Sequence, residues 1–177
     1  MSKTQKKTPL AVLVAAALLA ALSIVLGKYL AIRVGDTMRF SFENLPILLA
    51  GAAFGPLTGM LVAVGADLIG CLLVGYPVNP LITLGGALIG LLGGVLYRVL
   101  SKTPCLVRVA VTVIVSHIVG SVLIKSVGLA AFYSYPLWEL MLWRLLNYVI
   151  VGAAETALLY VVLKNRAIQN QIAQIRR

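Results

Sequence analysis

Apolar stretches of membrane-spanning length recur along the whole chain, and they constrain its fold more than any other feature. They run from about residue 10 to 32, 45 to 53, 57 to 74, 81 to 100, 106 to 124 and 140 to 163. A helix that crosses the hydrocarbon core needs about 20 apolar residues, and most of these stretches reach that length. The chain is 61% hydrophobic and 11% charged, far from the roughly 25% charged content of soluble domains. We therefore expect an all-α membrane protein, a bundle of about six transmembrane helices that forms a single domain over residues 1–177.

Two of these stretches need closer reading. The second has an apolar core of only about ten residues before Phe54-Gly55-Pro56 breaks it, so we expect a short, tilted or partly re-entrant helix there. The first follows Lys3, Lys6 and Lys7, as a signal peptide does, but it is longer than a signal-peptide core and ends without a small-residue cleavage site. We interpret it as the first transmembrane helix.

The formal net charge of +10 is concentrated in three short clusters. These comprise Lys3, Lys6 and Lys7 before the first helix, Arg98, Lys102 and Arg108 between the fourth and fifth, and Lys164, Arg166, Arg176 and Arg177 after the last. With an even number of spans, all three clusters lie on one face, which the positive-inside rule makes cytoplasmic. The basic charge is thus interpreted as topological, and no nucleic-acid partner is expected. The predicted location is the cell membrane, with several passes through the bilayer and both termini in the cytoplasm.

The loops on the opposite face are rich in aromatic residues, which indicates an interfacial belt or a ligand site. The first of them contains RFSFENLP (39–46), in which Phe40 and Phe42 alternate with polar residues before a helix start. This pattern predicts an extended segment, followed by a helix that is capped by Glu43 or Asn44 and has Pro46 in its first turn. We also expect an outer loop from Ser126 to Trp138.

Asp67 is the only charged residue in the run MLVAVGADLIGCLLVG (60–75). Ionisable groups inside a membrane usually face the bundle interior, pair with one another and mark a ligand or ion path. Counting from the predicted helix ends places Asp67, His117 and Asn147 roughly 12 Å deep and Arg144 nearer 8 Å. These groups are therefore expected to converge in the outer half of the membrane.

Simpler roles for these polar residues remain open. Asp67 and Arg144 can form an ion pair that only fixes helix packing, and His117 can bond to backbone or to Ser116. Glu155 lies deeper and is not expected to contact a ligand.

Small residues recur four apart on two of the predicted helices. On the first helix, three overlapping registers recur, Ala11 with Ala15, Ala16 with Ala20 and Ala17 with Ala21. This face, for which we name Ala11, Ala15, Ala16 and Ala20, either docks a separate membrane protein or packs internally. On the fourth, Gly86, Gly90 and Gly94 form a stripe for which internal packing is the favoured interpretation. Gly65 and Gly70 are expected to allow close approach of a helix or ligand beside Asp67.

Catalytic and metal-binding motifs are missing from the sequence. It contains no GxxxxGK[ST] phosphate loop, no HExxH and no GxSxG. Cys71 and Cys105 are expected to be packed thiols rather than ligands or a disulfide. We therefore expect a binding protein rather than an enzyme, with no cofactor or metal, whose energy source lies in other subunits.

The segment from Arg39 to Gly94 carries RFSFENLP, GPLTGM, ADLIG and YPVNP. Together with the alanine face and the six-helix size, it resembles the substrate-binding S components of energy-coupling factor vitamin transporters, above all the folate-specific one. The resemblance implies an outward-facing vitamin pocket. It also implies docking onto a transmembrane scaffold subunit that works with two cytoplasmic ATPases.

Folate chemistry suits the polar residues of the predicted pocket. A carboxylate at Asp67 matches the donor edge of the pterin, aromatic residues match its rings, and arginines match the glutamate tail. The expected ligand residues are Arg39, Phe40, Asn44, Asp67, Tyr76, Asn79, His117, Arg144, Asn147 and Tyr148. An S component for riboflavin, thiamine or a queuosine precursor remains an alternative, as does a small channel or scaffold protein.

Overall fold

The computed structural model describes residues 10–34 and 38–176, most of which are helical. Its elements are α1 (Leu10–Ile24), the π-helical η1 (Val25–Tyr29), β1 (Ile32–Val34), β2 (Met38–Phe40), α2 (Asn44–Phe54), α3 (Pro56–Val74), α4 (Pro80–Val99), η2 (Leu100–Lys102), α5 (Cys105–Ser116), the π-helical η3 (His117–Lys125), α6 (Ser126–Tyr133), α7 (Leu137–Lys164) and α8 (Arg166–Arg176). The two strands pair antiparallel, with Ile32 opposite Phe40. Met38–Phe40 begins the extended segment that the sequence predicts before α2.

Five helical segments within the described residues are long and apolar enough to cross a membrane. They are Leu10–Tyr29, Pro56–Val74, Pro80–Lys102, Cys105–Tyr133 and Leu137–Lys164. The predicted all-α membrane fold is confirmed. The remaining expected segment is α2, which has 11 residues and a length of roughly 16 Å, too short to cross the hydrocarbon core alone.

The break between the second and third segments lies where the sequence predicts it. Gly55 has a φ of +114°, a backbone conformation that disfavours side chains, and Pro56 opens α3. Glu43 is the N-cap of α2, but its side chain makes no capping hydrogen bond. Its carboxylate instead pairs with Lys125.

The fifth apolar segment does not end at Ile124. Instead, α5, η3 and α6 form one continuous helix that reaches Tyr133, so the prediction of a loop beginning at Ser126 is wrong. Lys125 lies inside this helix and is buried. Apolar residues resume immediately after it, and its charge has a partner inside the bundle, so the lysine does not terminate the span.

Glycines bring α2 and α3 into close contact with α4. A Cβ atom added at Gly51 would lie 2.6 Å from the carbonyl oxygen of Gly90 and 2.8 Å from the nitrogen of Gly94. One added at Gly59 would lie 2.5 Å from the same Gly90 oxygen. The favoured interpretation of the glycine stripe on the fourth helix, internal packing, is thereby confirmed for Gly90 and Gly94.

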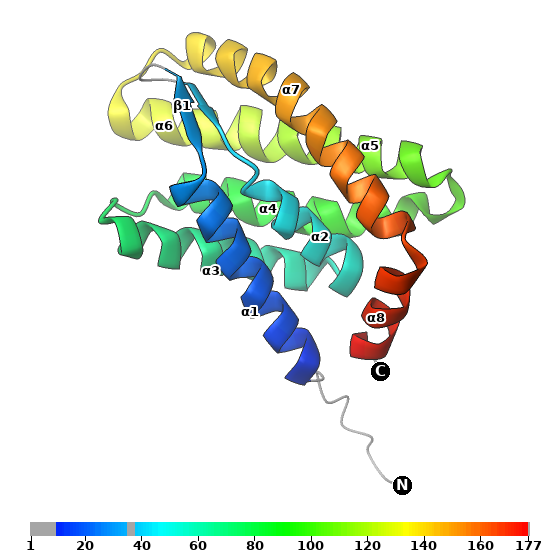
Figure 1. Ribbon diagram of the computed structural model, residues 1–177. Coiled ribbons are helices and arrows are strands. Elements are labelled where there is room, and N and C mark those ends of the chain that lie inside the picture. The colour runs from blue at the N-terminus through cyan, green and yellow to red at the C-terminus, as the bar shows by residue number, and fades with distance from the viewer. Residues whose placement is uncertain (1–9, 35–37, 177) are drawn as a thin grey trace, which may run out of the picture.

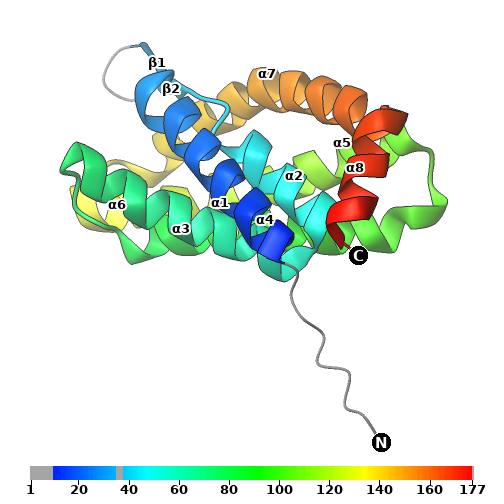
Figure 2. The same cartoon turned by 60° about the horizontal axis from the view of Figure 1, so that its bottom comes forward.

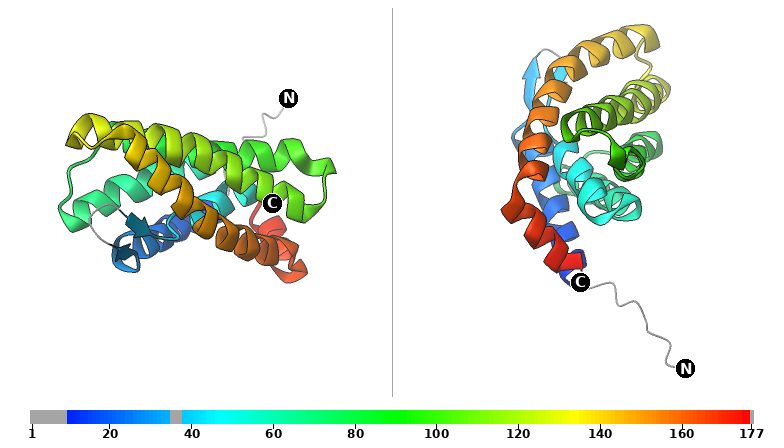
Figure 3. Two further views of the ribbon diagram at one scale, coloured as in Figure 1. Left: turned by 90° about the horizontal axis from the view of Figure 1, so that it is seen from above. Right: turned by 90° about the vertical axis from the view of Figure 1, so that its right-hand side faces the viewer.

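Figure 1 shows two ends of the bundle. The β1–β2 hairpin and the turns between α3 and α4 and between α6 and α7 lie at one end, and the α4–α5 and α7–α8 connections lie at the other. In the right-hand view of Figure 3, α1, α7 and α8 form one side of the molecule and α3 to α6 the other. Helix α8 turns back from α7 to contact α1 and α2, near the start of α1 in Figure 2.

The core lies between α2, α3, α4, α5 and α7. It includes Leu48, Ile89, Val113 and Leu159, each at most 3% exposed. The outer surface is also apolar: Leu18, Leu72 and Val149 are 66%, 77% and 66% exposed on three different spanning helices. Apolar exposure on this scale is typical of a surface that faces lipid.

Candidate functional site

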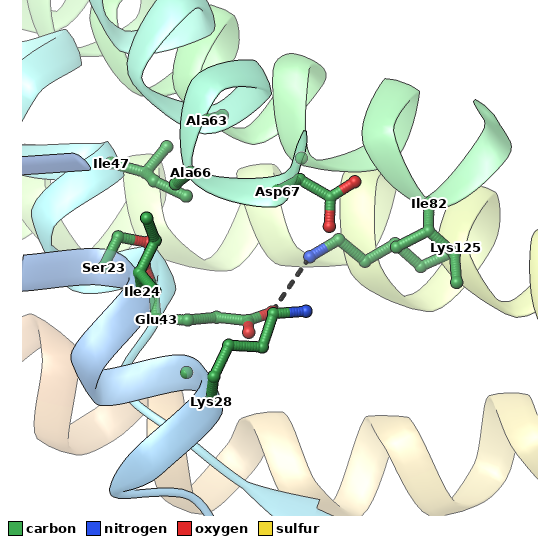
Figure 4. A pocket seen from close by; sticks show the side chains of 12 residues that line it. Ser23, Ile24, Lys28, Glu43, Ile47, Ala63, Ala66, Asp67, Ile82 and Lys125 are labelled. Carbon is green, nitrogen blue, oxygen red and sulfur yellow. Dashed lines mark hydrogen bonds and ion pairs between the residues drawn. The ribbon is translucent and has the colours of Figure 1, made fainter. Parts of the chain in front are cut away.

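A small cavity lies between α1, α3, α4, η3 and the start of α2, and Figure 4 shows the side chains around it. Its lining residues are Ser23, Ile24, Gly27, Lys28, Glu43, Ile47, Ala63, Ala66, Asp67, Ile82, Gly86 and Lys125. Its volume is about 30 Å³. A single water molecule needs a cavity of at least roughly 10–15 Å³ on the same measure, so this one suits only one or two small groups.

Four charged side chains from four parts of the chain meet at this cavity. They are Lys28 of η1, Glu43 just before α2, Asp67 of α3 and Lys125 of η3, and Figure 4 shows them directed toward one another. Lys125 Nζ lies 3.2 Å from Glu43 Oε1, and the two side chains are 8% and 25% exposed. We call these four residues the charge cluster.

The carboxylate of Asp67 is held by neutral neighbours as well as by this charge environment. Thr83 Oγ1 of α4 donates a hydrogen bond to Asp67 Oδ2 at 2.5 Å. The Cys71 thiol lies 3.8 Å from Asp67 Oδ1 and 3.7 Å from Lys28 Nζ. Both Cys71 and Cys105 are free thiols, as predicted. Asp67 therefore has polar partners on α3 and α4 and two lysines around the same cavity.

The two glycines beside Asp67 differ from each other. No atom of the described residues lies within 4 Å of a Cβ atom added at Gly65, so no helix approaches closely there, and close approach of a ligand stays a prediction. A Cβ at Gly70 would lie 2.9 Å from Lys28 Cε. The absence of a side chain at Gly70 thus leaves room for the stem of Lys28 on its way to the cavity.

Three further predicted ligand residues, Phe40, Tyr76 and Asn79, differ in their surroundings. Tyr76 is 45% exposed, and Lys28 Nζ lies 5.9 Å from its ring centroid. Phe40 is half-buried on β2. Asn79 caps α4 by accepting hydrogen bonds from the backbone of Leu81 and Ile82, and it donates one to the Gly128 carbonyl. Its amide is occupied by this capping role, so we leave it out of the ligand contacts proposed below.

Two of the predicted ligand residues, Arg39 and Asn44, belong to the RFSFENLP segment. Arg39 belongs to β2, and its side chain lies outside the described residues. Asn44 is fully buried, and neither polar atom of its amide has a hydrogen-bond partner in the described part of the chain. A buried amide without partners is costly, so Asn44 is a donor and acceptor ready for a polar group.

A second polar group lies at the seam between the fifth span and α7. His117 Nε2 lies 2.5 Å from Glu155 Oε2, and the histidine ring stacks on Tyr148 with ring centroids 4.3 Å apart. The other ring nitrogen lies 3.3 Å from Ser121 Oγ. His117 is 16 residues before the helix end at Tyr133, about 24 Å along the axis. It therefore lies near the middle of the helical segment Cys105–Tyr133, whereas the sequence predicted a depth of roughly 12 Å from the outer end.

Arg144 belongs to this seam. Its Nη1 donates to the carbonyl oxygen of Ser121 at 3.1 Å, and Asn147 is buried on the same helix. Among the described residues, Arg144 forms no ion pair with Asp67. The polar residues thus divide between the charge cluster and the α5–α7 seam.

The four alanines proposed for docking do not share one environment. Ala16 and Ala20 pack against the core, Ala15 is half-buried and Ala11 is exposed. Ala17 and Ala21, one position further along, are both exposed. The outward small-residue face of α1 is therefore the register of Ala17 and Ala21.

Sequence reasoning missed Lys28, Glu43, Thr83 and Lys125 as site residues. A signal for Lys125 was present, because apolar residues continue beyond it through Phe132. Lys28 was interpreted as the end of a span. No local pattern singled out Glu43 or Thr83, whose partners lie 82 and 16 residues away in sequence.

The cluster presents both signs of charge within one cavity. Its carboxylates can accept hydrogen bonds from a polar ligand edge, and its lysines can bind anionic groups. Apolar residues, including Ile24, Ile47 and Ile82, line the remainder. Such a site is suited to recognising a small polar molecule that carries donors and acidic groups.

Comparison with known proteins supports a binding role. The family model "ECF transporter, substrate-specific component" matches residues 11–172. Among solved structures, that of FolT bound with folic acid aligns with a TM-score of 0.70 and 24% identity, covering 84% of this chain and 89% of the other. An S-component for biotin from an ECF-type ABC transporter aligns with a TM-score of 0.63 and 20% identity, covering 93% and 95%. No curated protein matches the sequence.

Proposed function

This chain belongs to the substrate-specific components of ECF transporters, and we propose that it is the subunit that captures folate and delivers it for import. The observation that carries the proposal is the charge cluster, in a fold that resembles that of FolT. Folate has a pterin ring with a donor edge and a tail with two carboxylates. The cluster offers groups that complement both parts.

The proposed contacts assign one part of the ligand to each kind of side chain. Asp67 accepts hydrogen bonds from the pterin edge, and Thr83 fixes its carboxylate. Tyr76 and Phe40 stack against the rings, and Asn44 supplies a further polar contact. Lys28 and Lys125 bind the acidic tail in place of Arg144, whose guanidinium is bonded to a backbone carbonyl. Arg39 remains a candidate for the same tail.

The α5–α7 seam has a supporting role in this proposal. His117, Asn147, Tyr148 and Arg144 join α7 to the helix that carries Lys125, and they orient the cluster without contacting the ligand. Import then follows when the loaded subunit docks, through the outward face of α1, onto a membrane scaffold with two cytoplasmic ATPases. The protein itself is not an enzyme in this scheme and resides in the bacterial plasma membrane.

Biotin is the second candidate ligand, because a biotin S-component shares the fold over nearly the whole chain. Biotin has a ureido ring and one carboxylate, so it can also use both kinds of charge in the cluster. It lacks the flat pterin and therefore needs Tyr76 less than folate does.

Titration calorimetry with the detergent-solubilised protein tests the proposal. Folic acid should bind, and Asp67→Asn should weaken both folic acid and a tail-less pterin by about 10- to 100-fold, since a charged hydrogen bond is lost. Lys28→Gln should weaken folic acid and leave the tail-less pterin unchanged. Binding of biotin with no binding of folic acid would replace the proposed ligand. Mass spectrometry of co-purified small molecules gives an independent identification.

A further inference from the structure

Lys125 and Glu43 form an ion pair beside the cavity. Lys125 is almost completely buried and directs its ammonium group into the cavity, where Glu43 Oε1 lies 3.2 Å away. Glu43 approaches from the segment between β2 and α2, whereas Lys125 lies within a continuous spanning helix, eight residues from its end. Glu43 is also the more exposed member of the pair, at 25% against 8%. The carboxylate, not the cation, is therefore the member better placed to move.

The size of the cavity indicates that the cluster fills its own site. A cavity of about 30 Å³ does not admit a vitamin, since sites for such ligands usually measure roughly 300–1,000 Å³. Side chains that line it must therefore move when a vitamin enters, and an acidic group of the ligand reaches Lys125 only when Glu43 leaves it (Figure 4). A buried lysine that loses its partner needs another anion in its place.

We propose that Glu43 is an internal competitor that occupies the carboxylate-binding position on Lys125 and is displaced by a carboxylate of the ligand. This inference rests on the proposed function, in that the ligand is an acid bound at the charge cluster. Glu43 thereby sets selectivity: a neutral molecule of the same shape cannot replace its charge and leaves Lys125 paired as before. Ligand entry also releases the start of α2 from η3.

Asp67 does not take over from Glu43 in this scheme. Its two oxygens face Thr83 and Cys71, and the hydrogen bond from Thr83 is short at 2.5 Å. Lys28 approaches the same space from η1, with its ammonium group 3.7 Å from the Cys71 sulfur. The ligand carboxylate thus exchanges with Glu43 on Lys125 while Asp67 keeps its position for the other part of the ligand.

The test compares acids with their blocked forms. Folic acid and its diamide, and biotin and its amide, are titrated against wild-type protein, Glu43→Gln, Lys125→Gln and the control Glu139→Gln, which removes an exposed acid in the first turn of α7. Glu43→Gln should bind the acid forms about 10- to 100-fold more tightly, because one competing charged hydrogen bond is gone, and the blocked forms unchanged. Lys125→Gln should lose the preference for acids, and Glu139→Gln should match wild type.

A second arm needs no vitamin. Glu43→Ala leaves space beside Lys125, so sodium acetate should raise its thermal unfolding temperature more than sodium chloride at equal ionic strength, and wild type should show no such difference. No rescue by acetate would overturn the inference.

The outcomes separate the two proposals. If wild type binds biotin but not folic acid and Glu43→Gln tightens biotin, the folate proposal fails and the competitor role stands. If folic acid binds and Glu43→Gln weakens it, Glu43 is not a competitor although the folate proposal stands. Equal changes for acid and blocked forms would also overturn the competitor role.

Discussion

Single charged residues inside the bundle show how this protein tolerates ionisable groups at membrane depth. Lys125 and Asp67 lie eight and seven residues from the ends of their helices, about 10–12 Å along the axis. Each has a polar partner from another part of the bundle: Glu43, just before α2, pairs with Lys125, and Thr83 of α4 bonds to Asp67. Ionisable residues within spanning helices are rare, usually pair with one another and often mark a ligand or ion site, which agrees with a role in binding.

The His117–Glu155 pair gives a prediction at the same scale. His117→Phe keeps a ring against Tyr148 but leaves the fully buried Glu155 without its imidazole, and Glu155 Oε1 already has no partner among the described residues. We expect a loss of about 3–5 kcal/mol in stability, typical of breaking a buried pair. The double variant His117→Phe with Glu155→Leu should recover most of it. Thermal unfolding in detergent measures both.

Glu155→Gln is the matched control for that pair, because its amide keeps a hydrogen bond to the imidazole and should cost less than the loss of His117. A double variant as unstable as His117→Phe alone would contradict the pairing. If folic acid binds as proposed, its affinity for the recovered double variant should stay close to wild type, since the proposal assigns no ligand contact to the seam.

Between helices, the packing of α2 and α3 on α4 depends on glycine rather than on large apolar side chains. Gly51, Gly59 and Gly90 leave backbone against backbone, so a single methyl group has no space at these positions. The same close packing positions the start of α2, and with it Glu43, over the cavity. Helix packing thereby determines where Glu43 lies at the cavity.

Two glycines of α3 allow a direct test of that packing. Gly59→Ala places a methyl group within 2.5 Å of the Gly90 oxygen and should destabilise the protein, by about 1–3 kcal/mol as overpacking does. Gly65→Ala meets nothing within 4 Å and should be neutral or stabilising by up to about 1 kcal/mol, because alanine favours the helix. Thermal unfolding compares the two, and equal effects would argue against the glycine contact.

The exposed alanine face of α1 is predicted to dock on the scaffold subunit. Ala17→Trp adds bulk to the exposed register and should abolish vitamin uptake in cells while the purified protein still binds, because the scaffold can no longer approach. Ala20→Trp should instead lower stability, since Ala20 packs against the core. Leu61→Trp, on a 65% exposed position of α3, is the control for bulk in the lipid-facing surface. Normal uptake by Ala17→Trp would remove this face as the docking surface.

For the molecule as a whole, the distribution of charge predicts its orientation. Basic residues flank the connections at one end of the bundle: Arg98, Lys102, Arg108, Lys164 and Arg166. The hairpin and the aromatic turn before α7 lie at the other end (Figure 1). The positive-inside rule assigns the basic end to the cytoplasm. The charge cluster then lies toward the outer face, on the side from which a vitamin arrives.

Cysteine labelling in intact cells tests that orientation. In a background with Cys71 and Cys105 replaced, Tyr135→Cys in the α6–α7 turn should react with an impermeant thiol reagent, because the turn is exposed and belongs to the end that is predicted to face outward. Asn165→Cys, between α7 and α8, should react only after the cells are opened. The reverse pattern would invert the topology and place the cluster toward the cytoplasm.

Features that depend on residues close together in the chain could be predicted from the amino-acid sequence. An apolar stretch of about 20 residues predicts a spanning helix whatever the tertiary packing, so the all-α membrane class and five long spans were predictable. Gly55-Pro56 fixed the break before α3 for the same local reason. The motifs between Arg39 and Gly94 likewise indicated the family.

Which charged side chains meet depends on the three-dimensional packing of the helices. Glu43 and Lys125 are 82 residues apart in sequence, and their contact depends on how η3 and the start of α2 are rotated about their axes. Depth counted along a helix could not distinguish Lys125 from Arg144 as the cation near Asp67, because depth leaves the facing direction open. The facing direction matters because a charged group buried inside the bundle is costly unless the fold brings a partner to it.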